Sequence, residues 1–212
     1  MLERLHLVRH AEVENPRGVV YADLPGFGLS PVGSRQAAAA AAHLADSGAG
    51  VVVSSPLDRA TATAAAIASR LGVALQTDGR LLEWRLSSRW AGMPWDDLDE
   101  HFPGEVGAYL ANPYELAFAP ETIDQVAERM TGLVDDLDRA GEPIAILVSH
   151  QDPLQALRVR LTAAGRARFV DSKPGHASVI ALDRRGEAWI ETASWEPAIE
   201  SVAFPPPSRP TA

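Results

Sequence analysis

Short apolar runs alternate with longer helix-forming segments in the first third of the chain. Residues 5–8 and 51–53 are brief runs rich in leucine and valine, and with residues 73–76 they predict three strands. Residues 32–45 are rich in alanine, and residues 55–70 begin with a Ser-Pro pair that is typical of a helix start. The pattern therefore predicts strands that alternate with helices.

The same alternation returns in the second half. Apolar residues recur at helical spacing over residues 122–138, and the apolar run at 144–148 predicts a further strand. We expect Asp152 to be the N-cap of the next helix, because Asp-Pro is a regular helix start. Residues 179–182 and 188–190 then predict a closing pair of strands.

The middle of the chain departs from this regularity. Residues 81–120 lose periodicity and contain several prolines and, among other aromatic residues, Trp84, Trp90, Trp95 and Phe102, so we expect an irregular or helical insertion that forms a lid. Residues 1–203 are interpreted as one domain, and we expect the proline-rich residues 204–212 to form a disordered tail.

Strand and helix alternation of this kind predicts an α/β fold. We expect a three-layer sandwich, with a mostly parallel central sheet, helices on both faces and the lid insertion. In such sheets, ligands bind beyond the carboxyl ends of the strands. His10 and His150 each follow the end of a predicted strand, so the expected binding edge carries two histidines.

Composition narrows the chemistry. The 212-residue chain has no cysteine, which excludes disulfides and a cysteine nucleophile and leaves histidine as a candidate nucleophile. The net charge of −9 argues against a nucleic-acid partner. No run has the length of a membrane span and the N-terminus does not resemble a signal peptide, so we expect a cytoplasmic protein without a membrane partner. A sheet edge or the insertion would allow a homodimer.

Three stretches place basic residues just after apolar strands. They are Arg9-His10 within residues 8–12, Arg59 within residues 54–60, and His150 within residues 148–150. The planar guanidinium of arginine matches phosphate oxygens in a bidentate geometry. This combination of two arginines and two histidines therefore predicts a phosphate-binding site.

The ordered motifs resemble those of the histidine phosphatase superfamily, the phosphoglycerate mutase-like enzymes. The motifs are Arg-His-Ala at 9–11, Ser-Ser-Pro-Leu-Asp-Arg-Ala at 54–60, Leu-Leu-Glu at 81–83 and Ser-His at 149–150. The resemblance spans residues 5–182 and implies a fold and a mechanism that agree with the pattern above.

The resemblance implies a role for each residue of the site. His10 attacks phosphorus and forms a phosphohistidine, while Arg9, Arg59 and His150 hold the phosphate oxygens. Glu83 protonates the leaving alkoxide, because burial near phosphate raises the pKa of a carboxyl group. The scheme requires no metal and no cofactor. A solvated glutamate at the start of a loop is the alternative interpretation of Glu83.

Two further residues are candidate substrate ligands, and two positions depart from the family pattern. Asn15 and His176 are expected to contact the phosphate, with ordinary turn chemistry as the alternative for Asn15. Gln151 and Asp152 stand where the family commonly has two glycines. Asp152 would either repel phosphate, donate a proton or simply cap its helix.

The function favoured by these features is a metal-independent phosphomonoester phosphatase that acts on a small phosphorylated metabolite. A phosphoglycerate mutase-type phosphotransferase uses the same residues and remains an alternative. A phosphate-binding pseudoenzyme is the third interpretation, because of the departures at Gln151 and Asp152. The identity of the substrate is not encoded in these motifs.

Overall fold

The computed structural model of the protein describes residues 1–199, which contain one six-stranded sheet. The strand order is β3-β2-β4-β1-β5-β6. The first four of these are parallel to one another, β5 is antiparallel to β1, and β6 is antiparallel to β5. The strands are β1 (Arg4–Arg9), β2 (Val51–Ser54), β3 (Ala74–Thr77), β4 (Ile144–Ser149), β5 (Val179–Arg185) and β6 (Ala188–Trp195).

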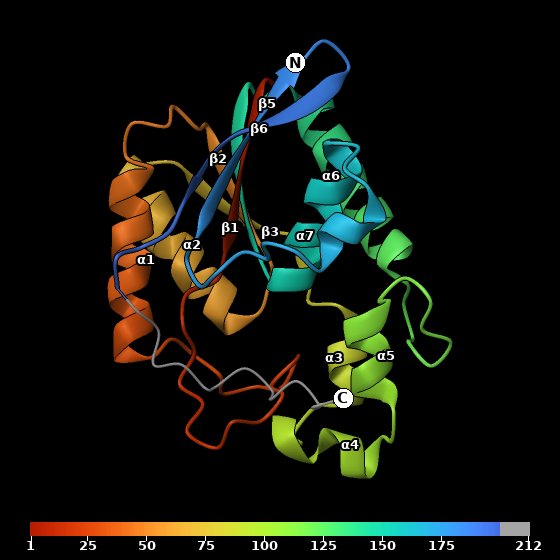
Figure 1. Cartoon of the computed structure of the whole chain (residues 1–212). Helices are drawn as coiled ribbons and strands as arrows, with labels where there is room; N and C mark the ends of the chain where they lie inside the picture. The colour runs from red at the N-terminus through yellow and green to blue at the C-terminus, as the bar shows by residue number, and fades with distance from the viewer. Residues whose placement is uncertain (200–212) are drawn as a thin grey trace.

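Helices cover both faces of this sheet, as predicted (Figure 1). On one face lie α1 (Pro31–His43) and α2 (Asp58–Leu71), and on the other lie α6 (Ile123–Ala140) and α7 (Gln151–Leu161). A short 3-10 helix, η3 (Arg166–Phe169), follows α7. The α/β class, the three layers and the mostly parallel sheet are thereby confirmed. None of the helices described within residues 1–199 has both the length and the apolar character needed to cross a membrane.

The apolar strands are explained by burial on both faces. In β4, Ala145 and Leu147 pack in the core beneath α6 and α7, whereas Ile146 and Val148 pack in the core beneath α1 and α2. Successive side chains of a strand point to opposite faces, so a strand covered on both sides needs a continuous apolar run. The continuous apolar run at 144–148 is therefore explained by the central position of β4 in the sheet.

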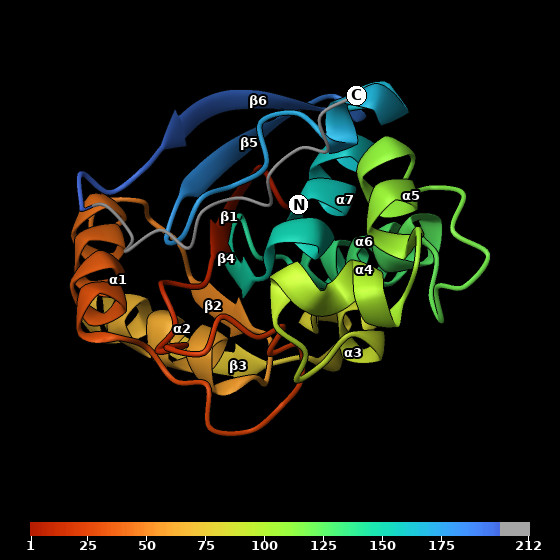
Figure 2. The same cartoon turned by 60° about the horizontal axis from the view of Figure 1, so that its bottom comes forward.

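The segment predicted as an insertion consists of short helices and irregular loops in about equal parts. It contains η1 (Gly79–Leu81), α3 (Arg85–Arg89), η2 (Trp95–Asp97), α4 (Leu98–His101) and α5 (Glu105–Ala111). Figures 1 and 2 show it beyond the carboxyl ends of the central strands, beside the loop that joins β1 to α1. Trp84 and Trp90 are buried in the core shared with α6 and α7. Its action as a lid stays a prediction.

Several predicted boundaries differ from the structure. The N-cap of α7 is His150, and Asp152 lies in the first turn, so the prediction that Asp152 caps this helix was wrong. The side chain of Asp152 is instead held by Lys173 and Tyr109. The closing strands are longer than the predicted 179–182 and 188–190. The tail predicted at 204–212 lies outside the described residues.

The start of α1 packs closely against the chain that follows β1. The hydroxyl of Ser30 accepts a hydrogen bond from the amide of Gly33 (2.9 Å) and donates one to the carboxylate of Glu12 (2.8 Å). A Cβ added at Gly33 would lie 2.0 Å from the carbonyl oxygen of Glu12. Only glycine allows this approach of two backbones, two residues from His10.

We expect Gly33→Ala to lower the free energy of unfolding by about 1–3 kcal/mol, the usual cost of overpacking against atoms that cannot move aside. Chemical denaturation followed by circular dichroism measures the change. Gly107→Ala is the matched control, because nothing lies within 4 Å of its added Cβ on the exposed α5. That variant should be as stable as the native protein or up to about 1 kcal/mol more stable. Equal effects of the two substitutions would contradict the backbone clash.

Candidate active site

The ends of three parallel strands meet at one edge of the sheet. The amide of His10, just after β1, donates to the carbonyl of Ser149 in β4 (2.9 Å). The amide of Ser55, just after β2, donates to the carbonyl of Val148 (2.9 Å). As a result, the rings of His10 and His150 have centroids only 5.2 Å apart. The two histidines predicted at strand ends are therefore brought together.

His10 is held in one orientation and in one protonation state. Its Nδ1 lies 2.8 Å from the carbonyl oxygen of Ala11, which can only accept, so Nδ1 carries the hydrogen and Nε2 has a free lone pair. The side chain is 1% exposed. Burial lowers the pKa of His10 well below its usual value, and the positive charge of Arg59 lowers it further. The ring is therefore neutral and nucleophilic at Nε2.

Arg9 lies at the end of β1 and contacts His176. One guanidinium nitrogen donates to the carbonyl of Pro174 (3.0 Å) and another to Nε2 of His176 (3.0 Å). Nε2 of His176 accepts this bond, so that ring is neutral, and burial together with Arg9 lowers the pKa of His176 to about 3. The rings of His176 and His10 have centroids 5.6 Å apart. Both residues therefore reach the site, as predicted.

Arg59, in the first turn of α2, is buried close to His10. It donates to the carbonyl of Ala22 (2.7 Å), and its guanidinium lies over the ring of Tyr21, 4.7 Å from the centroid. Burial lowers the pKa of Arg59, which nevertheless stays charged. The Nε atoms of Arg59 and Arg9 are buried and have no hydrogen-bond partner within residues 1–199. One buried and one half-buried cation, Arg59 and Arg9, therefore lie close to His10, suited to an anionic group.

The second histidine is oriented by a residue that the sequence interpretation missed. The hydroxyl of Ser55 accepts from the amide of Leu57 (3.4 Å) and lies 2.8 Å from Nε2 of His150, to which it can donate its hydrogen. That arrangement leaves the hydrogen of His150 on Nδ1, which has no hydrogen-bond partner in the described chain. Ser55 was predicted only to begin a helix, and α2 begins instead at Asp58.

Glu83 lies between η1 and α3, with Oε2 3.8 Å from Nδ1 of His150. Its Oε1 accepts a hydrogen bond from the amide of Trp84 (2.8 Å). Burial, and next the negative charge of Asp152, raise the pKa of Glu83 to about 7 despite the opposing attraction of Arg59. A carboxyl group with this pKa can both donate and accept a proton near neutral pH.

Asp152, the departure from the family pattern, forms a polar cluster with residues from two other segments. Its carboxylate oxygens lie 2.7 Å from Nζ of Lys173 and 3.1 Å from the hydroxyl of Tyr109. Nζ of Lys173 also donates to the hydroxyl of Tyr109 (2.8 Å). The cluster fixes the negative charge of Asp152 and joins α7 to α5.

Asn15 and Glu12 shape the loop after His10. Both ends of the Asn15 amide bond to the backbone of Val19, at 2.9 and 3.2 Å, so turn chemistry occupies this side chain. The amide of Glu12 donates to Oε1 of Gln36 (2.9 Å), and its carboxylate accepts from Ser30. Asn15 lines the pocket, and its predicted contact with phosphate stays a prediction.

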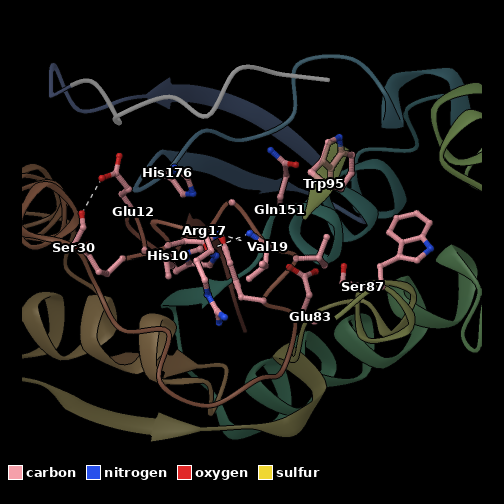
Figure 3. A pocket seen from close by; sticks show the side chains of 18 of the residues that line it. His10, Glu12, Arg17, Val19, Ser30, Glu83, Ser87, Trp95, Gln151 and His176 are labelled. Carbon is pink, nitrogen blue, oxygen red and sulfur yellow. Dashed lines mark hydrogen bonds between the residues drawn. The ribbon is translucent and has the colours of Figure 1, made fainter. Parts of the chain in front are cut away.

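Arg9, His10, Asn15, Glu83 and His176 line a pocket of about 950 Å³, whereas Arg59 and His150 are buried behind its lining. Figure 3 shows His10 near its centre, with His176 and Gln151 above and Glu83 below in this view. Within the part of the chain that the structure describes, no three His, Asp or Glu side chains are grouped to hold a metal ion. The expectation that the chemistry needs no metal or cofactor stays a prediction.

Comparison with known proteins places the chain in a family. Residues 5–195 match the histidine phosphatase superfamily (branch 1). The chain is 38% identical over 205 residues to the uncharacterized protein Rv0525 of Mycobacterium tuberculosis, covering 92% of this chain and 96% of that protein. It is 30% identical over 187 residues to phosphoserine phosphatase 1 of Hydrogenobacter thermophilus, covering 86% and 88%.

A solved structure agrees with these matches. The mycobacterial glucosyl-3-phosphoglycerate phosphatase Rv2419c, in complex with VO3, superposes with a TM-score of 0.79 at 28% identity, covering 90% of this chain and 97% of that one. The family match and the fold agree with a sheet edge that carries two histidines and two arginines. The chain therefore belongs to branch 1 of the histidine phosphatase superfamily and is a phosphatase.

Proposed function

We propose that this phosphatase hydrolyses phosphomonoesters of small metabolites through a phosphohistidine at His10, without a metal. The observation that carries the proposal is the hydrogen bond from Nδ1 of His10 to the carbonyl of Ala11, at 2.8 Å. It leaves the lone pair of Nε2 free close to the guanidinium groups of Arg9 and Arg59. A neutral, oriented imidazole next to an anion-binding site is suited to attack a phosphoryl group.

In the first step, Arg9, Arg59 and the Nδ1 hydrogen of His150 bind the phosphoryl oxygens and stabilise their charge. Nε2 of His10 forms a bond to phosphorus while the bond to the ester oxygen breaks. The leaving alkoxide takes the proton of Glu83, whose pKa of about 7 keeps this group partly protonated at neutral pH. The alcohol departs and phosphohistidine remains.

In the second step, Glu83 is a carboxylate and accepts a proton from water. The oxygen of that water forms a bond to phosphorus as the bond from phosphorus to Nε2 of His10 breaks. Inorganic phosphate leaves, and His10 is again neutral. Glu83 thus serves first as an acid and then as a base. The phosphohistidine intermediate divides one difficult displacement into two easier ones.

The names of the relatives support the class of substrate. One relative is a phosphoserine phosphatase, and the matched solved structure is a glucosyl-3-phosphoglycerate phosphatase. Both compounds are phosphate monoesters of an alcohol. They differ in the organic part, so the relatives support hydrolysis of a phosphomonoester and leave its alcohol open.

We expect His10→Ala to lower kcat/KM for phosphomonoesters at least about a thousandfold, because the nucleophile is lost. Rapid quenching with labelled ester should trap a base-stable, acid-labile phosphoenzyme in the native protein and none in the variant. His101→Ala is the control, since His101 is exposed on α4 and does not line the pocket. A phosphoenzyme in the His10→Ala variant would contradict the assignment. Transfer of the label to monophosphoglycerate would identify a mutase.

The role of Glu83 predicts a dependence on both pH and leaving group. kcat/KM of the native protein should fall as pH rises through about 7, because the protonated acid becomes a carboxylate. Glu83→Gln should lower kcat/KM for alkyl phosphates about a hundredfold. It should affect p-nitrophenyl phosphate much less, since p-nitrophenolate leaves without a proton. Equal losses for both esters would contradict the assignment of Glu83 as the acid.

The negative charge of Asp152 should determine the pH at which kcat/KM falls, the alkaline limb of the pH profile. Because that charge raises the pKa of Glu83, Asp152→Asn should lower this pKa and move the limb to lower pH. Tyr109→Phe is the matched control, because it removes a partner of Asp152 and keeps the charge. Profiles of kcat/KM against pH measure both variants. A limb that moves in Tyr109→Phe and not in Asp152→Asn would contradict this explanation.

A further inference from the structure

The pocket continues well beyond the groups that would bind phosphate. Arg9, His10, Glu83 and His176 line one part of it. A volume of about 950 Å³ greatly exceeds the needs of a phosphoryl group and is typical of sites that enclose a large organic molecule. The part around Trp95, called here the apolar end, is lined by the apolar side chains of Val19, Val20, Pro94 and Trp95, and Val19 pairs with Pro94.

Backbone hydrogen bonds hold this apolar end in shape. Val20 donates to the carbonyl of Met93 and accepts from the amide of Gly92, both at 2.8 Å. The amide of Trp95 donates to the carbonyl of Gly18 (3.2 Å). These bonds join the loop after β1 to the segment after α3, so the apolar walls are formed before any ligand binds. A preformed surface loses little conformational entropy on binding.

Trp95 offers a supported aromatic surface within this end of the pocket (Figure 3). Its ring packs edge-on against Trp90, with centroids 6.1 Å apart and planes at 89°. Trp90 is buried and is itself fixed by a hydrogen bond from its indole to Glu105 (3.0 Å). Trp95 is only partly buried and lines the pocket. An apolar group in the pocket would therefore meet a surface that does not need to rearrange.

Charge does not select a second anionic group at this end. The charged residues there carry both signs and are exposed at the rim, where solvent weakens their interactions. They are Glu14, Arg17, Arg35 and Asp96. Glu12 is buried but engaged with Ser30. Apolar contact is therefore the main source of discrimination between alcohols.

We infer, on the basis of the proposed function, that the preferred substrates are phosphomonoesters of bulky apolar or aromatic alcohols. The phosphate lies at His10, and the hydrocarbon part packs between Trp95 and the valines of the loop after β1. Small polar esters such as phosphoserine fill only the phosphate end, so they forgo this apolar contact.

The test uses phosphate esters of primary alcohols that differ mainly in the size and polarity of the organic part. Initial rates are measured for 2-(1-naphthyl)ethyl phosphate, ethyl phosphate and phosphoserine, all esters of primary alcohols. We expect kcat/KM for the naphthylethyl ester to exceed that for ethyl phosphate at least about tenfold. Trp95→Ala should reduce this ratio at least about fivefold, mainly through KM, and Trp95→Phe should retain most of it.

Binding to the His10→Ala variant separates this inference from the proposed function. Calorimetry with the same esters should show tighter binding of the naphthylethyl ester, whether or not the native protein turns over any of them. A preference in binding without hydrolysis would reject the proposed mechanism and keep the apolar site. Equal affinities, or a ratio of kcat/KM near one that Trp95→Ala leaves unchanged, would overturn the inference.

Discussion

The parallel pairing of β1 with β4 is the constraint on which the site depends. Its register aligns Arg9 with Ser149, and the next amide, that of His10, continues the ladder to the carbonyl of Ser149. Parallel strands end at the same edge, so His10 and His150, which are 140 positions apart in sequence, become neighbours. The same ladder extends to β2, which adds Ser55 and the start of α2. These side chains are thus placed by backbone hydrogen bonds of the sheet.

The burial of positive charge explains the protonation states at this edge. Arg9 and Arg59 lie close to His10, and because Arg59 is buried and Arg9 half-buried, less water screens their charges than at the surface. Their field and the loss of solvent disfavour a second cation, so His10 and His150 remain neutral. For Glu83, the cost of burial exceeds the attraction of the arginines. One arrangement therefore keeps the imidazole of His10 neutral and the carboxyl group of Glu83 partly protonated near neutral pH, as the proposed mechanism requires.

The sequence predicted the features that depend on short-range patterns, such as strands and motifs. It did not predict side-chain contacts between residues that are far apart in the chain. The strand ends and their basic residues were identified because apolar runs and motifs are local. Asp152 was wrongly assigned as a cap, because its partners Lys173 and Tyr109 lie 21 and 43 residues away. Likewise, Ser55 could be interpreted only as a helix start, although its hydroxyl contacts His150, 95 residues away. Side-chain hydrogen bonds across such distances leave no periodic signal in a sequence.

The two parts of the pocket are built by different segments of the chain. The proposed chemistry explains why Glu83 lies between them. Strand ends build the phosphate end, whereas the loop after β1 and the segment around Trp95 build the apolar end. Glu83 lies directly ahead of α3, on the chain that leads to Trp95. A proton donor must reach the oxygen that joins phosphorus to the alcohol, which lies at the boundary between the two ends. Substitutions around Trp95 can therefore change the alcohol that fits while the strand ends keep the nucleophile and the arginines in place.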